Sequence, residues 1–166
     1  MDVDGRGLSV GETAPKISTT DINGNEINSE ELLRENRGLL IDFFRGAWWH
    51  GWREHSKLLN DHLNEFTKRD IQLISISCDS VNHLKEYEDK YDLKFPQISD
   101  KGATIAKKYD VNIFDHIPGK KMKFKQAIPC KFLINKTGEI VWTYFPKTKT
   151  DRPEIDTILK AIEDKC

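Results

Sequence analysis

The chain has 166 residues, of which 37% are hydrophobic and 32% are charged, and its 26 basic side chains nearly balance its 27 acidic ones. A domain of about 150 residues buries roughly 70% of its unfolded surface, so we expect one domain spanning residues 1–166. The balanced charge argues against nucleic acid and membrane as partners. No apolar run reaches signal-peptide length at the N-terminus, or the roughly 18 residues of a membrane-spanning helix elsewhere. We therefore expect a cytoplasmic protein.

The three cysteines, Cys78, Cys130 and Cys166, form no Cys-x-x-Cys pair and no metal-binding spacing. Their number is odd, so they do not form a disulfide framework. In a reducing compartment such thiols usually serve as small buried residues, or lie in a tail as we expect for Cys166. Cys166 could then at most link chains under oxidising conditions.

Strands and helices alternate in the first half of the chain. Residues 20–26 contain Asn-Gly and predict a hairpin turn, because Asn-Gly supplies the positive φ that such turns require. Ser29 is the expected start of a short helix. The apolar run 39–44 predicts a strand buried on both faces. Apolar residues on one face of residues 50–68 predict a single helix, in which Trp52 begins the core stripe.

The second half continues the alternation. It predicts a strand at 71–78, a helix capped by Asp79-Ser80, a helix at 101–108, strands at 130–135 and 139–144, and a last helix opened by Pro153. This order predicts an α/β protein with a thioredoxin-like fold, a central mixed sheet with helices on both faces. We expect strand 39–44 at the centre, beside 73–77 and 131–134, with 131–134 antiparallel to it.

Whole segments resemble one protein family. They are Gly11–Pro15 with Asp21–Gly24, Ile41–Trp48, Ile74–Ser80, Phe95–Asp100, Ala106–Val111 and Phe132–Ile140. Over residues 8–163 the chain is similar to the peroxiredoxin-like, or alkyl hydroperoxide reductase (AhpC/TSA), group of the thioredoxin superfamily. The resemblance implies that fold and a family of antioxidant thiol peroxidases and oxidoreductases, without a bound cofactor or metal.

The family's active-site residues are replaced in this chain. The resemblance implies a proline, a threonine, a peroxidatic cysteine and an arginine, and these positions fall on Arg45, Trp49, Trp52 and Pro129. A thioredoxin-like Cys-x-x-Cys would also fall on Trp49 and Trp52. A peroxidatic cysteine attacks as a thiolate, which an indole cannot replace. We therefore expect no catalytic residue here, and a non-catalytic binding or interaction module.

The same resemblance implies a binding site. Pro129, preceded by Ile128, falls where thioredoxin-like proteins keep a cis proline beside the active-site helix, so we expect a cis bond that helps to bind an extended peptide. Trp49 is either an aromatic platform or a space filler, whereas Trp52 is expected to be buried. With His50, these residues form the expected site for a protein or peptide partner.

His50, Glu54 and His55 invite a metal-site interpretation. The two histidines are five residues apart, which places them about 140° apart around a helix rather than on one face. We therefore favour a polar helix start, with Glu54 near the positive end of the helix dipole.

Two alternatives to the non-catalytic interpretation involve an enzyme. A thiol-dependent peroxidase or disulfide oxidoreductase could use Cys130 or Cys78. The expected fold places both cysteines at the same end of the sheet, where one strand ends and another begins, with strand 39–44 between them. Two strand spacings, about 10 Å, exceed the roughly 7 Å limit for a disulfide. Alternatively, the tryptophans replaced cysteines in an active parent enzyme.

Lys120, Lys121, Lys123 and Lys125 are interleaved with Met122 and Phe124. The alternation indicates a strand with one basic face. Such a face either discourages edge-to-edge aggregation or binds an anionic partner near the site.

Overall fold

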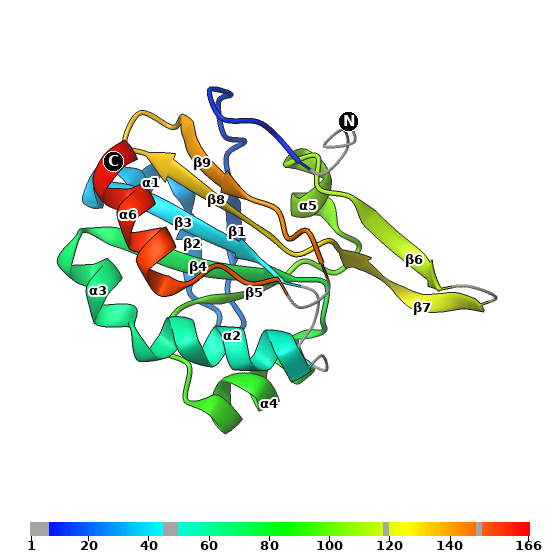
Figure 1. Ribbon diagram of the computed structural model, residues 1–166. Helices are drawn as coiled ribbons and strands as arrows, with labels where there is room; N and C mark the ends of the chain where they lie inside the picture. Colours follow the sequence, from blue (N-terminus) through cyan, green and yellow to red (C-terminus); the bar gives the residue numbers. More distant parts are fainter. Residues whose placement is uncertain (1–6, 45–49, 118–119, 149–150) are drawn as a thin grey trace.

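The structure is a computed structural model that describes residues 7–44, 50–117, 120–148 and 151–166. For residues 50–52, 114–117 and 120–126 it describes the backbone, and for the others it also describes the side chains. Its main sheet has five strands in the order β5-β4-β3-β8-β9 (Figure 1). The strands are β3 (Gly38–Phe43), β4 (Ile71–Ser77), β5 (Gln97–Ser99), β8 (Cys130–Asn135) and β9 (Ile140–Tyr144). β3, β4 and β5 are parallel, whereas β8 is antiparallel to β3 and β9 is antiparallel to β8.

β3 lies at the centre of this sheet, which confirms the expected order of the three core strands. Every residue of β3 is buried because both faces of the strand are covered. Leu39, Ile41 and Phe43 belong to one core cluster, and Leu40 belongs to a second cluster on the other face. The uninterrupted apolar pattern thus reflects two cores that share one strand.

Six helices in the described residues cover the two faces (Figure 1). They are α1 (Ser29–Glu35), α2 (His50–Asp61), α3 (Leu63–Lys68), α4 (Val81–Tyr91), α5 (Thr104–Lys108) and α6 (Ile155–Lys165). Apolar residues of α2, α3, α4 and α6 join the cluster of Leu40, whereas those of α1 and α5 join the cluster of Ile41. The mixed α/β class and the cover on both faces are therefore confirmed. None of these helices combines the length and the apolar character that crossing a bilayer requires.

The single helix expected over residues 50–68 was wrong. His62 has φ −109° and ψ 16° and separates α2 from α3. The break redirects the chain so that α3 packs on β4 and buries Phe66 completely. Burial of an aromatic side chain compensates for the interrupted helix.

α1 begins at Ser29 as expected, whereas two other helix starts differ from expectation. Asn28 caps α1, because its side chain accepts hydrogen bonds from the N–H groups of Glu30 and Glu31, whereas the Ser29 hydroxyl accepts one from the Ile17 N–H. α5 begins only at Thr104, since Ala103 before it is left-handed at φ 62°. α6 begins at Ile155, two residues after Pro153. The cap at Ser80 is confirmed by its bond from the His83 N–H.

Two hairpins lie outside the main sheet. β1 (Ser18–Thr20) and β2 (Glu26–Asn28) pair antiparallel and confirm the turn expected from Asn-Gly. β6 (Ile113–Ile117) and β7 (Lys120–Ala127) form a separate antiparallel ribbon. Figure 1 shows this ribbon projecting from one end of the molecule.

Candidate functional site

One end of the main sheet brings together Cys78, Cys130 and the Ile128–Pro129 stretch, and we call it the site edge. Here β3 and β4 end and β8 begins, since Phe43 pairs with Ile76 on one side and with Cys130 on the other. Arg45 and Trp49 lie outside the described residues, as do the side chains of His50 and Trp52. The roles expected of these four side chains stay predictions.

Ile128 and Pro129 connect β7 to β8 and are both partly buried. Ile128 donates its N–H to the carbonyl of Asn112 at 2.9 Å and packs against the core cluster of Ile41. The described part of the chain contains no cis peptide bond. The prediction of a cis Ile128–Pro129 bond is therefore wrong. The trans form is the lower-energy isomer of an X-Pro bond by about 0.5–1 kcal/mol.

Cys130 and Cys78 are both buried at the site edge, with exposed fractions of 2% and 6%. β3 lies between β8, which Cys130 begins, and β4, which Cys78 follows, as the sequence indicated, and among the described residues neither sulfur forms a disulfide. Burial raises the pKa of the Cys130 thiol, a shift that the neighbouring Lys131 cation opposes and the Asp42 carboxylate reinforces. Cys130 is therefore a thiol, not a thiolate, at neutral pH.

Cys166 does not lie in a tail. It follows α6, donates its N–H to the Ile162 carbonyl at 3.0 Å and is partly buried. Its carbonyl accepts a hydrogen bond from Arg37 Nε at 2.9 Å. Burial raises the pKa of this thiol as well, although the Arg37 cation lowers it.

A buried ion pair joins two strands next to the site edge. Lys131 Nζ donates to Asp42 Oδ1 at 2.5 Å, and their side chains are 2% and 0% exposed. The two residues are direct cross-strand partners in β8 and β3. The Ser75 hydroxyl donates to the second Asp42 oxygen at 3.4 Å. A buried charge of this kind persists only because it is paired and hydrogen-bonded.

His55, in α2, lies close to this pair and is 3% exposed. Its pKa is lowered from 6.5 to about 2, first by burial and then by the positive charges of Lys131 and Arg152. The imidazole is therefore neutral at physiological pH. The side chain of His50 lies outside the described ones, so the metal-site interpretation of His50, Glu54 and His55 stays untested.

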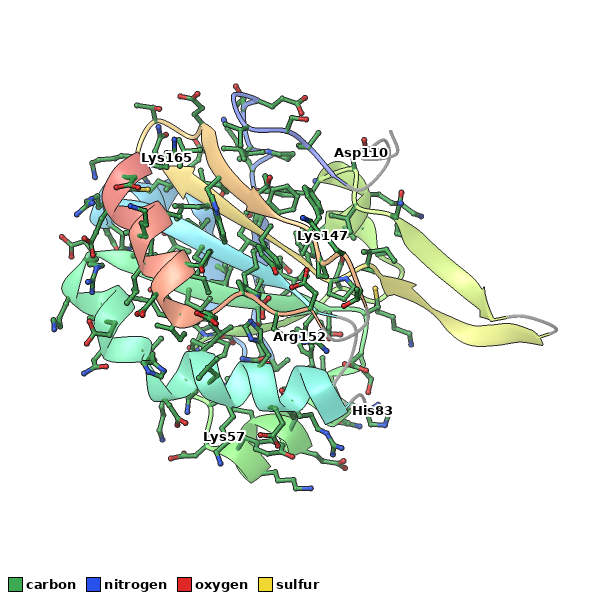
Figure 2. All side chains as sticks on the ribbon, viewed as in Figure 1. Lys57, His83, Asp110, Lys147, Arg152 and Lys165 are labelled. Carbon is green, nitrogen blue, oxygen red and sulfur yellow. The ribbon has the colours of Figure 1, made fainter. Side chains whose placement is uncertain are left out.

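The segment after β9 adds further charged groups. The Tyr144 hydroxyl donates to Asp151 Oδ1 at 2.5 Å, and the Lys147 N–H donates to Asp151 Oδ2 at 2.8 Å. The tyrosine hydrogen bond, followed by that from Lys147, lowers the pKa of the Asp151 carboxyl. Figure 2 shows Lys147 and Arg152 at the same end of the sheet as the ribbon.

The interior next to the site edge thus contains a buried ion pair and a neutral imidazole. Sequence reasoning did not identify Asp42, Lys131 or Arg152, and assigned His55 only to a helix start. A usable signal existed, since Asp42 and Lys131 each interrupt an otherwise apolar strand. Charged residues are almost never fully buried unless they are paired.

The AhpC/TSA family model matches residues 10–143, and the chain belongs to this family. The "Thiol-disulfide oxidoreductase ResA" of Bacillus thuringiensis is 26% identical over 156 residues, which cover 93% of this chain and 79% of that protein. The "Putative peroxiredoxin bcp" of Coxiella burnetii is 26% identical over 144 residues, covering 87% and 92% of the two chains.

A solved structure supports the fold. The peroxidoxin BcpB of Mycobacterium tuberculosis superposes with a TM-score of 0.80 at 18% identity, over 95% of this chain and 97% of that one. The peroxiredoxin-like resemblance and the thioredoxin-like fold expected from the sequence are therefore confirmed. The family includes peroxiredoxins and thiol-disulfide oxidoreductases.

Proposed function

We propose that this member of the AhpC/TSA family has lost the peroxidatic cysteine and acts in the cytoplasm as a non-catalytic binding module. The observation that carries the proposal is the state of Cys130. It begins β8 at the site edge, yet it is buried, and its pKa is raised by that burial. The segment from Arg45 to Trp52, which leads into α2, contains no cysteine.

The chemistry of the family depends on a thiolate that peroxide or a disulfide can reach. A cysteine at a helix start gains a lowered pKa from the helix dipole. Cys130 lies in a strand and Cys78 directly follows one, so neither has that advantage. Burial additionally hinders the approach of a peroxide or a disulfide to either sulfur.

The binding role concerns the site edge, and its partner is a protein or an extended peptide. Ile128 and Pro129 are partly buried there, in a stretch between β7 and β8 that belongs to no strand. Extended peptides bind proteins by adding a strand to an exposed sheet edge, and this stretch directly follows such a strand, β7. Trp49 and His50 are the proposed neighbours of this stretch.

A second candidate is a thiol-dependent peroxidase or disulfide oxidoreductase that uses Cys130. One observation favours it, because the Lys131 ammonium next in the chain lowers the pKa of the Cys130 thiol and opposes the effect of burial. The paired Asp42 carboxylate acts in the opposite direction, so the cation is largely neutralised at this position.

Steady-state consumption of hydrogen peroxide with dithiothreitol as reductant tests the proposal. We expect the wild-type protein, Cys130→Ser and Cys78→Ser to consume peroxide no faster than an equal concentration of free cysteine. Enzyme-like turnover that Cys130→Ser abolishes would establish the second candidate instead. Turnover that survives both substitutions would place the chemistry elsewhere and would also overturn the proposal.

A further inference from the structure

The ribbon formed by β6 and β7 concentrates positive charge in a chain that is nearly neutral. β7 contains Lys120, Lys121, Lys123 and Lys125, and the ribbon's acidic residue is Asp115 in β6. The whole chain has a formal net charge of −1. The residues outside the ribbon therefore carry a net negative charge, and the ribbon is locally basic.

The ribbon stands next to the site edge. β7 ends at Ala127, and only Ile128 and Pro129 separate it from Cys130, the first residue of β8. Figure 1 shows the ribbon extending outwards from the end of the sheet where α2 begins. A partner that contacts the Ile128–Pro129 stretch would therefore meet β7 directly.

The ribbon has unused backbone pairing capacity. Within the described chain, β6 and β7 pair with each other and with no other strand. The register shifts between the pair Phe114–Gln126 and the pair His116–Lys121, so Asp115 lies opposite a longer stretch of β7. Such irregularities are frequent beside functional sites. A two-stranded ribbon is only marginally stable alone and gains from a third strand.

The residues of β7 alternate between two chemistries. In the sequence of β7, Lys121, Lys123 and Lys125 alternate with Met122 and Phe124, a spacing that a regularly pleated strand places on opposite faces. A strand whose only purpose is to prevent aggregation needs the charges but not the large apolar residues between them. The pattern instead matches an added strand in which acidic and apolar residues alternate.

Charged residues of the main body also lie near this end. Lys131 and Arg152 both act on His55 as positive neighbours. Two carboxylates near this end are already engaged, since Asp42 is paired with Lys131 and Asp151 accepts from Tyr144 and Lys147. The positive charge available to a partner at this end is therefore that of the lysines of β7.

We propose that the outer edge of β7 binds an extended segment of a protein partner in which acidic residues alternate with apolar ones. This inference rests on the proposed function and names the chemistry of its partner. The lysines select the acidic side chains, and backbone hydrogen bonds along β7 hold the segment. Nucleic acid and anionic membranes offer charge but no strand to complete the ribbon.

Fluorescence anisotropy of a short labelled peptide, in which glutamate alternates with valine, tests the inference with the full chain. We expect Lys121→Gln/Lys123→Gln/Lys125→Gln to weaken binding by about tenfold, the sum of several partly screened ion pairs. The matched control, Lys57→Gln/Lys85→Gln/Lys90→Gln on α2 and α4, removes the same charge and should change affinity less than about twofold. Equal losses in both variants, or no binding to the wild type, would overturn the inference.

A charge reversal keeps the test decisive if the triple variant is poorly folded. We expect Lys121→Glu/Lys123→Glu/Lys125→Glu to lose the glutamate peptide and to gain a peptide with lysine in place of glutamate. Failure to gain it would contradict the strand geometry. Tighter binding of phosphatidylserine vesicles or of duplex DNA than of the glutamate peptide would overturn the inference. The partner would then be a membrane or a nucleic acid rather than a protein. Peroxide turnover would refute the proposed function independently of all these results.

Discussion

The ammonium group of Lys131 lies 2.5 Å from a carboxylate oxygen of Asp42, on neighbouring strands, and almost no solvent reaches either side chain. Removal of one member of such a pair leaves an uncompensated charge in the core, which costs about 3–5 kcal/mol. We expect Lys131→Met to lower the free energy of unfolding by this amount in urea denaturation.

The surface pair Lys160–Asp164 is the control for this prediction, since its side chains are 78% and 53% exposed. Lys160→Met should change the free energy of unfolding by less than about 1 kcal/mol. Adding Asp42→Asn to Lys131→Met should recover part of the loss, because the unpaired charge disappears. Equal losses of unfolding free energy in Lys131→Met and Lys160→Met would show that the buried pair stabilises the fold no more than a surface pair does.

His55 makes the stability depend on pH. Its pKa is about 2 in the folded protein and 6.5 ordinarily, so between these values the unfolded chain binds a proton that the folded protein does not. Stability is fully present above about pH 6.5 and is lost as the pH falls, by about 1.4 kcal/mol per pH unit from this group.

Urea denaturation at several pH values between about 7 and 5 measures this slope, in a range above the ordinary pKa of carboxylates. We expect His55→Gln to flatten the slope, whatever its effect on stability at neutral pH. The control is His83→Gln, since His83 is exposed in α4 and should leave the slope unchanged. An unaltered slope in His55→Gln would contradict the burial of a neutral imidazole.

The order of the central strands could be predicted from the sequence, because a short and almost continuous apolar run such as 39–44 fits few structures other than a strand that is buried on both faces. It failed where tertiary contacts decided the outcome. The helix break at His62 depends on the burial of Phe66 against β4, and no local signal marks it. The Asp42–Lys131 pair depends on strand register over 89 residues of separation, which periodicity does not contain. The trans Ile128–Pro129 bond contradicts an expectation taken from family resemblance alone.

The three cysteines should differ from those of an active peroxidase in their reactivity. Cys78 and Cys130 are buried, and burial raises the pKa of both Cys130 and the partly buried Cys166. We expect a thiol-reactive disulfide reagent to label the native protein slowly, with Cys166 first, and to label all three cysteines at once in denaturant. Rapid labelling of Cys130 in the native protein would contradict the burial described above.

A substitution of Trp52 tests whether this side chain fills the core or lies on the surface. If it fills the core beneath the start of α2, as the sequence predicts, Trp52→Cys removes a large apolar side chain and destabilises the protein by about 3 kcal/mol or more. Thermal unfolding measures the effect, with Leu58→Ala as the control, since Leu58 is an exposed α2 residue. Unchanged stability in Trp52→Cys would identify Trp52 as a surface platform.

The rate at which hydrogen peroxide oxidises Cys130 in a single turnover tests the loss of peroxidatic activity most directly. Trapping of the sulfenic acid, followed by mass spectrometry of the peptide that contains Cys130, yields this rate for the intact protein. Because burial keeps the sulfur protonated, we predict a rate constant no greater than that of free cysteine under the same conditions. A rate constant about a hundredfold or more above free cysteine, which would require an activated thiolate at Cys130, would contradict the account and make this chain a peroxidase with a relocated thiol.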